Sequence, residues 1–372
     1  MRKVLFILLT YISLQVYGQI IVDHTVVDKF DDIPQEYIDE VKKMWLSYAG
    51  ESHSSAIRTG LTLLESVDSR FQVNVTESGI PETYTSSHLR ASRATWGDLL
   101  NSTGWRYSYG EEDWYTSSTA INRTKAGITY YNTIGPELNA FGFGWCWDSA
   151  EEADDMVTYL NATQQYIDYC ITNDYPTEVF FTTGPVDGAN ATGEVGYNKY
   201  LAYEAIRDYV ALDETRILFD YADILCYDDD SETPNTTTWS GHVYPIITTT
   251  NSLPEQTGHI SNAGALRLAR AMWWMLAKIA GWDGGAPLVI DDNQYNKGYS
   301  KKIVTHDKIE LQLDEHNSKW SAALYDFQGM EIIKKAIESD LLTFDISTLS
   351  SGIYFIVLSK GREKLVEKVI KP

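Results

Sequence analysis

A serine-rich string early in the chain contains the residue types of a nucleophilic site. The string Gly-Glu-Ser-His-Ser-Ser occupies residues 50–55, between two stretches with helical spacing. A glycine permits a tight turn, and a serine beside a helix N-terminus can expose its hydroxyl while its own N–H stabilises an oxyanion. Ser52 is therefore the candidate nucleophile. A serine-rich N-cap turn without a catalytic role is the alternative interpretation of the same string.

A second string, late in the chain, contains the candidate general base. Residues 258–264 are Gly-His-Ile-Ser-Asn-Ala-Gly and stand directly before a long apolar stretch with helical spacing. A histidine in this place can accept the proton of a serine and return it later, so His259 is the candidate base; a purely structural helix cap is the alternative. Glu255 is the candidate to orient the imidazole, because a carboxylate near an imidazole N–H fixes the tautomer and stabilises the imidazolium. A backbone carbonyl is the alternative orienting group.

The other histidines offer alternatives of a different kind. His53, His88 and His242 are the remaining candidate bases in the main part of the chain. His53 and His242, with nearby acids, would be the basis of a metal-dependent hydrolase. No Walker, dinucleotide-binding or zinc-protease motif is present. We therefore expect no metal and no cofactor.

Alternating helices and strands must position the two strings. Helical spacing covers residues 34–46, 56–67, 149–170, 200–209 and 262–280, and strand patterns or apolar runs cover residues 71–75, 140–147, 179–183 and 217–219. This order predicts an α/β fold, a three-layer α/β/α sandwich with a mainly parallel sheet, in which functional residues lie beyond the carboxyl ends of the strands. Residues 80–135 are rich in Thr, Ser, Tyr and Trp and are expected to form an insertion with β-hairpins.

The acidic composition limits the classes of partner. The chain has 372 residues, with 30 Lys and Arg against 52 Asp and Glu, and a net charge of −22. A field of this sign repels phosphate backbones and anionic lipid headgroups. We therefore expect a neutral or cationic substrate and no nucleic-acid partner. Aromatic residues reach 13%, and those of residues 105–115 suit stacking on sugar rings, with plain packing as the alternative.

The first residues predict export. Residues 1–18 combine a basic start, an apolar run and a small residue before Gln19, which is the pattern of a secretory signal peptide. The apolar run is too short to span a bilayer permanently, and no other run approaches membrane length, so we expect no integral membrane segment. Three cysteines allow at most one disulfide and are interpreted as mainly buried small hydrophobes.

Composition changes near residue 290. The polar, turn-rich residues 290–302 are interpreted as a linker that follows a main domain at residues 19–289. Residues 303–372 contain nine Lys and Arg and eleven Asp and Glu, so the first 302 residues carry a net charge of −20. Strict alternation of apolar and polar residues in this last part predicts a small all-β sandwich.

The C-terminal part contains three motifs in a recognisable order. They are Leu-Tyr-Asp-Phe-Gln-Gly at residues 324–329, Ile-Ser-Thr-Leu-Ser-Ser-Gly-Ile-Tyr at residues 346–354 and Lys-Val-Ile at residues 368–370. Together they resemble the C-terminal sorting domain of the type IX secretion system. The resemblance implies that the type IX secretion machinery is a partner. It also implies export across the outer membrane of a Bacteroidetes-type bacterium, to the cell surface or the medium. A terminal carbohydrate-binding sandwich is the alternative.

The serine and histidine strings together resemble the SGNH (GDSL-like) hydrolases, over about residues 40–285. In that family the first block carries the nucleophilic serine and the last block carries the base, which corresponds to Ser52 and His259. The resemblance implies oxyanion donors at Gly79, with Gly97 as the alternative, and at Cys146.

Three departures from the family pattern stand beside this resemblance. Glu51 replaces the usual Asp of the first block, and Gln256 stands where the last block has Asp. The third block, at residues 144–148, lacks the side-chain amide that donates to the oxyanion.

The expected function is that of a secreted serine hydrolase that cleaves a carboxylic ester of an acylated carbohydrate or another neutral ester. Ser52 would form the acyl-enzyme, and His259 would then assist the attack of water. The alternative is a non-catalytic SGNH-like surface or carbohydrate-binding protein, which the three departures favour.

Overall fold

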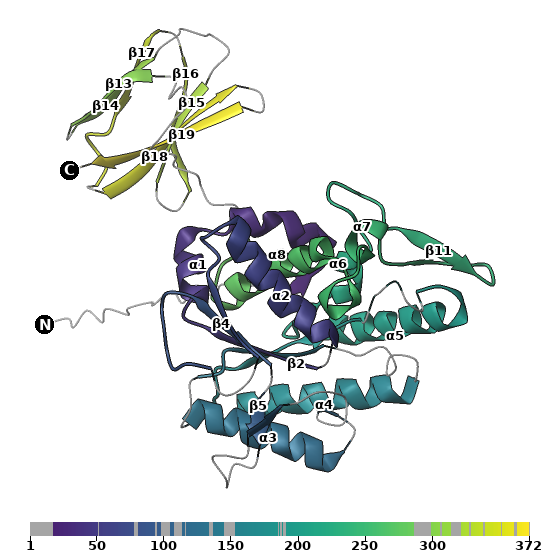
Figure 1. Cartoon of the computed structure of the whole chain (residues 1–372). Coiled ribbons are helices and arrows are strands. Elements are labelled where there is room, and N and C mark those ends of the chain that lie inside the picture. The colour runs from purple at the N-terminus through teal and green to yellow at the C-terminus, as the bar shows by residue number, and fades with distance from the viewer. Residues whose placement is uncertain are drawn as a thin grey trace, which may run out of the picture. The chain divides into compact units, whose positions relative to one another are not determined.

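The computed structural model (Figure 1) shows the chain as two compact units, Met1–Pro287 and Leu288–Pro372. Each unit has a hydrophobic core of its own. The structure describes residues 18–50, 52–77, 81–93, 95–97, 105–107, 114–115, 117–133, 137–144, 153–184, 186, 188, 191–285, 299–305, 307–313, 321–326, 329–337, 339–350, 352–360 and 363–371.

The larger unit is built around a parallel sheet. Its strands are β1 (Ile21–Val22), β2 (Trp45–Gly50), β3 (Val73–Thr76), β4 (Leu89–Ser92), β7 (Ala140–Gly144), β8 (Glu178–Val179), β9 (Phe181–Thr182) and β10 (Leu218–Phe219). One ladder has the order β3-β4-β2-β7-β8, the other has the order β1-β10-β9, and every pairing is parallel. Only Phe180 separates β8 from β9, and its N–H donates to the Phe141 carbonyl. The two ladders therefore form one continuous sheet.

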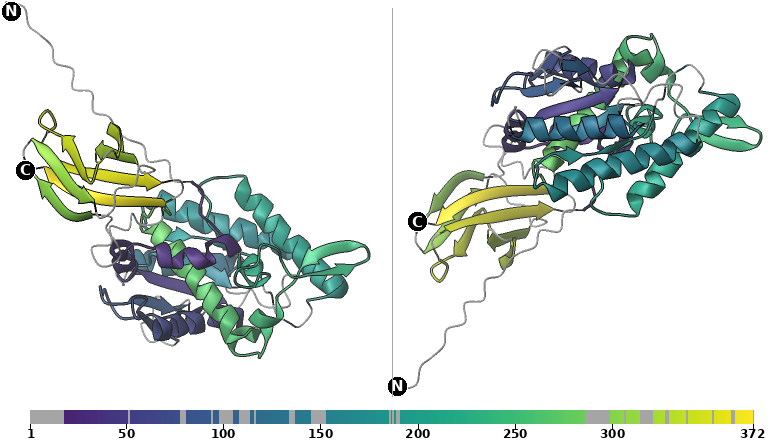
Figure 2. Two further views of the ribbon diagram at one scale, coloured as in Figure 1. Left: turned by 90° about the horizontal axis from the view of Figure 1, so that it is seen from above. Right: turned by 90° about the horizontal axis from the view of Figure 1, so that it is seen from below.

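Helices cover both faces of this sheet, as Figures 1 and 2 show. One face carries η1 (His24–Asp32), α1 (Gln35–Val41), α2 (Ser52–Val67), α6 (Tyr221–Leu225) and α8 (Asn262–Ile279). The other face carries α3 (Ser118–Thr133), α4 (Ala153–Thr172) and α5 (Gly193–Ala211). This arrangement confirms the three-layer α/β/α fold with a parallel sheet that the sequence predicts.

The central strands are apolar on both faces because helices cover both faces. All six residues of β2 and all five of β7 are buried. Helices α2 and α8 approach closely at Gly60, where a Cβ would lie 2.0 Å from the Ala265 carbonyl oxygen. A glycine is therefore required at this crossing.

Two expected elements differ in the structure. The helix expected over residues 34–46 ends at Val41, and Trp45–Gly50 is the central strand β2. A short strand buried on both faces has no alternation, so its pattern does not differ from that of a buried helix segment. Among the described part of residues 80–135, one antiparallel pair exists, β5 (Thr95–Gly97) with β6 (Trp105–Tyr107). The rest of that region contributes β4 to the main sheet and the helix α3.

The segment between α6 and α8 contains only short elements. They are the hairpin strands β11 (Thr236–Trp239) and β12 (His242–Pro245), the helix α7 (Thr249–Ser252) and the 3-10 turn η4 (Thr257–His259). Cys170 and Cys226 are buried free thiols, and burial raises the pKa of Cys170 to about 12. Cys146 lies outside the described residues.

The C-terminal unit is all β and antiparallel. One sheet has the order β13-β14-β17 and the other the order β16-β15-β18-β19. Their bounds are β13 (Tyr299–Val304), β14 (Lys308–Leu313), β15 (Ser321–Asp326), β16 (Glu331–Ala336), β17 (Leu341–Asp345), β18 (Gly352–Lys360) and β19 (Glu363–Lys371). Alternate residues of β14 are buried, which confirms the predicted sandwich pattern. None of the helices that the structure describes, in either unit, has the length and apolar character needed to cross a bilayer.

Candidate active site

The serine string lies at the turn from the central strand β2 to helix α2. Gly50 ends the strand with a φ of +108°, and a Cβ there would lie 2.0 Å from the Gly144 carbonyl oxygen. Ser52 is the first residue of α2 and is partly exposed. The turn therefore lies at the carboxyl end of a parallel strand, where α/β folds place their functional residues.

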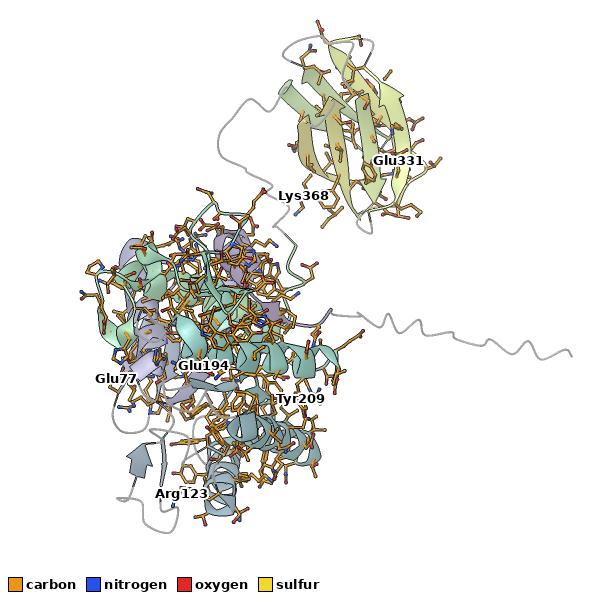
Figure 3. The ribbon with its side chains drawn as sticks, turned by 90° about the vertical axis from the view of Figure 1, so that its right-hand side faces the viewer. Glu77, Arg123, Glu194, Tyr209, Glu331 and Lys368 are labelled. Atoms are coloured by element: carbon orange, nitrogen blue, oxygen red, sulfur yellow. The ribbon has the colours of Figure 1, made fainter. Side chains whose placement is uncertain are left out.

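Buried polar contacts hold this turn. The Ser54 hydroxyl donates to the Gly50 carbonyl at 3.0 Å. Arg58, only 2% exposed, donates to the Ser54 carbonyl at 3.1 Å and pairs with Glu77, labelled in Figure 3, at 2.7 Å. Burial lowers the pKa of Arg58, and the Glu77 carboxylate opposes that shift. The N-terminal turn of α2 is thus fixed by contacts on its inner side.

The histidine string packs directly against the same turn. Gly258 has a φ of +77°, and a Cβ there would lie 2.6 Å from Ala56 Cβ and 3.0 Å from the Ser52 carbonyl oxygen. His259, the next residue, also has a positive φ, of +61°. Left-handed backbone at a residue other than glycine is costly and is found at tight turns and at functional sites. The fold therefore brings two strings that are far apart in the sequence into contact.

His259 has a carboxylate beside its ring. Its Nδ1 lies 3.0 Å from Glu255 Oε1, with side-chain exposures of 46% and 58%. A carboxylate on Nδ1 favours the tautomer with the proton on that nitrogen, which leaves Nε2 as the acceptor of a proton. Within the described residues, no hydrogen bond joins His259 to the hydroxyl of Ser52.

A second, buried imidazole lies beside the ring of the candidate base. His53 is 1% exposed, and its ring centroid is 5.4 Å from that of His259 and 6.3 Å from that of Tyr221. Two imidazoles and a phenol ring are therefore grouped beside Ser52, at the carboxyl ends of β2 and β10.

Several sequence-predicted residues lie elsewhere. Gly79 and Cys146, the expected oxyanion donors, lie outside the described residues. Gly97, the alternative donor, ends β5. His88 contacts Glu82 just before β4, at the amino end of that strand, and His242 lies in the hairpin strand β12. Neither of these two histidines is therefore placed to act with Ser52.

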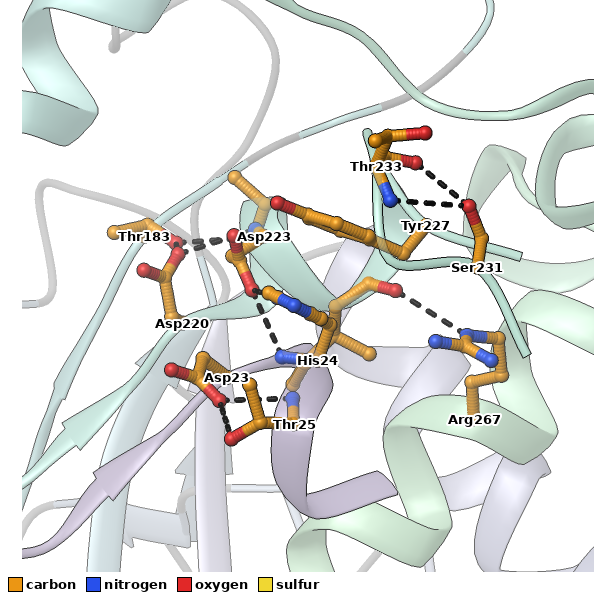
Figure 4. Close-up of polar contacts among 12 residues, drawn as sticks. Asp23, His24, Thr25, Thr183, Asp220, Asp223, Tyr227, Ser231, Thr233 and Arg267 are labelled. Carbon is orange, nitrogen blue, oxygen red and sulfur yellow. Dashed lines mark hydrogen bonds and ion pairs between the residues drawn. The ribbon is translucent and has the colours of Figure 1, made fainter. Parts of the chain in front are cut away.

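Asp23 and His24, which sequence reasoning did not select, belong to a polar cluster at the carboxyl ends of the neighbouring strands (Figure 4). Asp23 and His24 follow β1, and His24 Nδ1 lies 2.5 Å from Asp223 Oδ2 at the start of α6. The His24 ring also stacks on Tyr227 at a centroid distance of 3.4 Å. In the part of the chain that the structure describes, one set of three residues has metal-type ligand atoms within 4.8 Å of one another, and it consists of Asp23, His24 and Asp223. Strand β1, which precedes Asp23 and His24, has only two residues. The sequence therefore contains no periodic strand signal at this place.

Asp220 anchors the same region. It is 4% exposed and accepts hydrogen bonds from Thr183 Oγ1 at 2.6 Å and from Arg207 Nε at 2.6 Å. Burial by itself lowers the pKa of Arg207. The carboxylates of Asp220 and Glu204 outweigh burial, so the pKa of Arg207 is raised. Burial and the charge of Asp220 raise the pKa of Asp223, although His24 acts in the opposite direction. These groups join the ends of β1, β9 and β10 to α5 and α6.

Comparison with known proteins identifies the C-terminal unit. The family model described as the secretion system C-terminal sorting domain matches residues 305–372. This unit is therefore a type IX secretion sorting domain, and the protein is exported, for secretion or for attachment to the cell surface. None of the curated proteins matches the chain. Among solved structures, an endo-β-1,4-mannanase from Thermotoga petrophila is similar at 10% identity. The match covers 90% of this chain and 70% of that one at a TM-score of 0.18, which is too low to show a shared fold.

Proposed function

We propose that the larger unit, exported by means of the sorting domain, is a serine hydrolase that cleaves a carboxylic ester of a neutral substrate, an acylated carbohydrate. Ser52 attacks the carbonyl carbon, His259 takes the serine proton and returns it to the leaving alcohol, and Glu255 orients His259. Water then cleaves the acyl-enzyme with His259 as the base. In this proposal the N–H of Ser52, at the N-terminus of α2, donates to the oxyanion.

The observation that carries the proposal is the 3.0 Å contact between His259 Nδ1 and Glu255 Oε1, in a turn packed against the first turn of α2. A serine at a strand-to-helix turn, a histidine and a carboxylate on its far nitrogen are the components of a catalytic triad. The backbone strain at His259 further supports a functional role.

The alternative is a non-catalytic surface or carbohydrate-binding protein with the same fold. It is favoured by one observation: among the described residues, no hydrogen bond joins Ser52 to His259. Such contacts are often long in ligand-free enzymes and shorten when substrate binds, so the missing hydrogen bond is compatible with catalysis.

The test is covalent labelling of the full-length chain with a fluorophosphonate probe, with mass-spectrometric mapping of the labelled serine. Label on Ser52 that is lost in Ser52→Ala is the expected result. Hydrolysis of short-chain aryl esters should fall by about 10⁴-fold or more in Ser52→Ala and His259→Ala. In Glu255→Gln it should fall by about 10²-fold.

Two variants serve as matched controls. Ser66→Ala removes an exposed serine at the other end of α2, and His88→Ala removes a histidine whose ring forms hydrogen bonds with Glu82 and with its neighbour Ser87. Both should retain labelling and turnover. Absence of label and of turnover in a folded wild-type sample would refute the hydrolase and leave the binding protein.

A further inference from the structure

A cavity of about 260 Å³ lies beyond the carboxyl ends of β9 and β10. Its lining includes Tyr200, Tyr203, Glu204 and Arg207 of α5, and Asp223 of α6. The ring of Tyr221, two residues before Asp223, lies 6.3 Å from that of His53, which follows Ser52. The cavity therefore lies at the same edge of the sheet as the candidate active site. Its volume lies just below the range of about 300–1,000 Å³ that is usual for ligand pockets, which suits one small polar unit.

An aromatic surface adjoins this cavity. It consists of Tyr197 and Tyr200 on α5 with Trp239 and His242 on the β11–β12 hairpin, which lies beside α5 in Figure 1. The ring of Tyr197 stacks on His242 with a centroid distance of 4.7 Å and lies 5.4 Å from Trp239. Tyr197, Tyr200 and Trp239 are partly exposed, and His242 is exposed.

The hairpin that presents these rings is fixed in its conformation. Trp239 pairs with His242 across a two-residue turn, in which Ser240 and Gly241 have φ values of +47° and +86°. Positive φ at both central residues is the geometry of a type I′ hairpin turn. Tyr244 Oη donates to the Gly193 carbonyl at 3.1 Å, which ties the hairpin to the start of α5. The rings are therefore held in place before any ligand binds, which lowers the entropic cost of binding.

The aromatic surface leads directly into the cavity. Tyr200 belongs to both, since it lines the cavity and stacks against Tyr244 of the hairpin at 5.9 Å. Pro245, the last residue of β12, also lines the cavity. An extended ligand can therefore place one end in the cavity and the rest across the rings.

The chemistry of the cavity selects the class of ligand. Glu204 and Asp223 supply carboxylate oxygens, which accept hydrogen bonds from hydroxyl groups. The guanidinium of Arg207 is already engaged by Asp220 and Glu204, so it offers little attraction to an anion. The net charge of −22 also disfavours anions. Ring faces that contact C–H surfaces, together with acceptors for hydroxyl groups, match a neutral sugar.

We infer that this cavity and the aromatic surface bind a neutral oligosaccharide, with one sugar in the cavity and the next sugars across Tyr200, Tyr197 and Trp239. The inference rests on the proposed function and deepens it, because it gives the carbohydrate part of the ester a site at the same edge of the sheet as Ser52. Binding itself needs no catalysis and is measured separately from it.

The experiment is calorimetric titration of the full-length Ser52→Ala chain with a panel of neutral β-linked and α-linked hexasaccharides, and with choline as a cationic probe. We expect binding of at least one hexasaccharide and none of choline. Trp239→Ala and Tyr200→Ala, each in the Ser52→Ala background, should raise the Kd at least about tenfold, because aromatic residues dominate such surfaces. Glu204→Gln keeps the shape of the cavity and should raise the Kd several-fold.

Tyr84→Ala is the matched control, since this tyrosine is 67% exposed and lies far along the chain from α5 and the hairpin. It should leave the Kd unchanged. The absence of hexasaccharide binding, equal Kd values in all variants, or preferential binding of choline would each overturn the inference. Binding by a chain that shows no fluorophosphonate labelling would support the inference and refute the hydrolase. Ester turnover without hexasaccharide binding would refute the inference and support the hydrolase.

Discussion

Two consecutive residues with left-handed backbone shape the candidate active site. Gly258 has a φ of +77° and His259 a φ of +61°. Gly258 has no side chain, which allows the turn to pack closely against α2. His259 places its imidazole beside the carboxylate of Glu255. Glycine adopts this conformation at little cost, whereas histidine does not. The strain at His259 is offset by the packing of the turn against Ser52 and Ala56.

At the residue scale, we predict that Gly258→Ala destabilises the protein more than Gly193→Ala. The two glycines have nearly equal φ values of +77° and +75°, but a Cβ has nothing within 4 Å at Gly193 and would overlap Ala56 at Gly258. The free energy of unfolding should fall by about 1 kcal/mol in Gly193→Ala from backbone strain. It should fall by about 2–4 kcal/mol in Gly258→Ala, since overlap adds to strain.

The measurement is urea unfolding of both variants, together with their turnover of aryl esters. Gly258→Ala should also lose turnover, because His259 moves with its neighbour. Equal free energies of unfolding for the two variants would contradict the close packing of the turn.

At the scale of elements, a buried ion cluster fixes the edge of the sheet that carries the candidate active site and the cavity. Asp220 follows β10 and binds Arg207 of α5 and Thr183 beyond β9. His24 beyond β1 binds Asp223 of α6. Short strands provide few ladder hydrogen bonds, so side-chain contacts between their ends contribute much of the local order.

We predict that Asp220→Ala lowers the free energy of unfolding by about 3 kcal/mol, because it leaves the partly buried Arg207 with only one carboxylate. The control is Asp31→Ala, which removes an exposed partner of Arg70 and should cost less than about 1 kcal/mol. Both are measured by urea unfolding.

A second step separates the lost contact from the charge left behind. The double variant Asp220→Leu with Arg207→Met should be more stable than Asp220→Leu alone, since no buried charge is then left without its main partner. Glu204 also loses Arg207, but its side chain is 43% exposed and is solvated by water. A double variant that is less stable than the single one would argue that Arg207 packs for other reasons.

At the scale of the whole molecule, the net charge and the individual carboxylates act in opposite directions as the pH falls. At neutral pH the net charge is −22, and repulsion among the negative side chains destabilises the folded state. This repulsion decreases as the pH approaches the isoelectric point of about 4.6. The pKa of Asp68 is lowered by the Arg70 side chain, and that of Asp213 by the N–H and hydroxyl of Thr215. A lowered pKa in the folded state stabilises above the ordinary aspartate value and is lost as the pH falls through the folded value.

We predict, therefore, that the stability of the larger unit rises from neutral pH to about pH 5 and falls below about pH 4, where unperturbed aspartates take up protons. Asp223 acts in the opposite sense, because burial raises its pKa in the folded state. Protonation of Asp223 as the pH falls therefore stabilises the folded state. The measurement is the urea midpoint followed by tryptophan fluorescence, which reports mainly on this unit because ten of the eleven Trp precede residue 290.

The salt dependence provides the control for this prediction. At about 0.5 M salt the Debye length shortens to a few ångströms, so the rise between pH 7 and pH 5 should largely disappear. The fall at lower pH should persist, since hydrogen-bonded carboxylates are screened less. A rise of the same size at high salt would show that charge repulsion is not its cause.

The sequence by itself determined the features that depend on local pattern. Period and capping predict the long helices, such as α4 and α8, since one apolar face repeats along each of them. The alternation in β14 and the motifs around it predict the sorting domain that the family model confirms at residues 305–372. Residue type and spacing single out Ser52, His259 and Glu255 as candidates.

Only the tertiary structure decided which of these parts meet. Burial on both faces makes Trp45–Gly50 a central strand, and this cannot be read from a periodicity that such burial removes. The contact of Gly258 with Ser52, and the pairing of His24 with Asp223, join residues about two hundred positions apart. The cavity beside α5 likewise forms only where α5, α6 and the hairpin converge. Contacts at such separation depend on the packing of whole elements, and no local pattern encodes them.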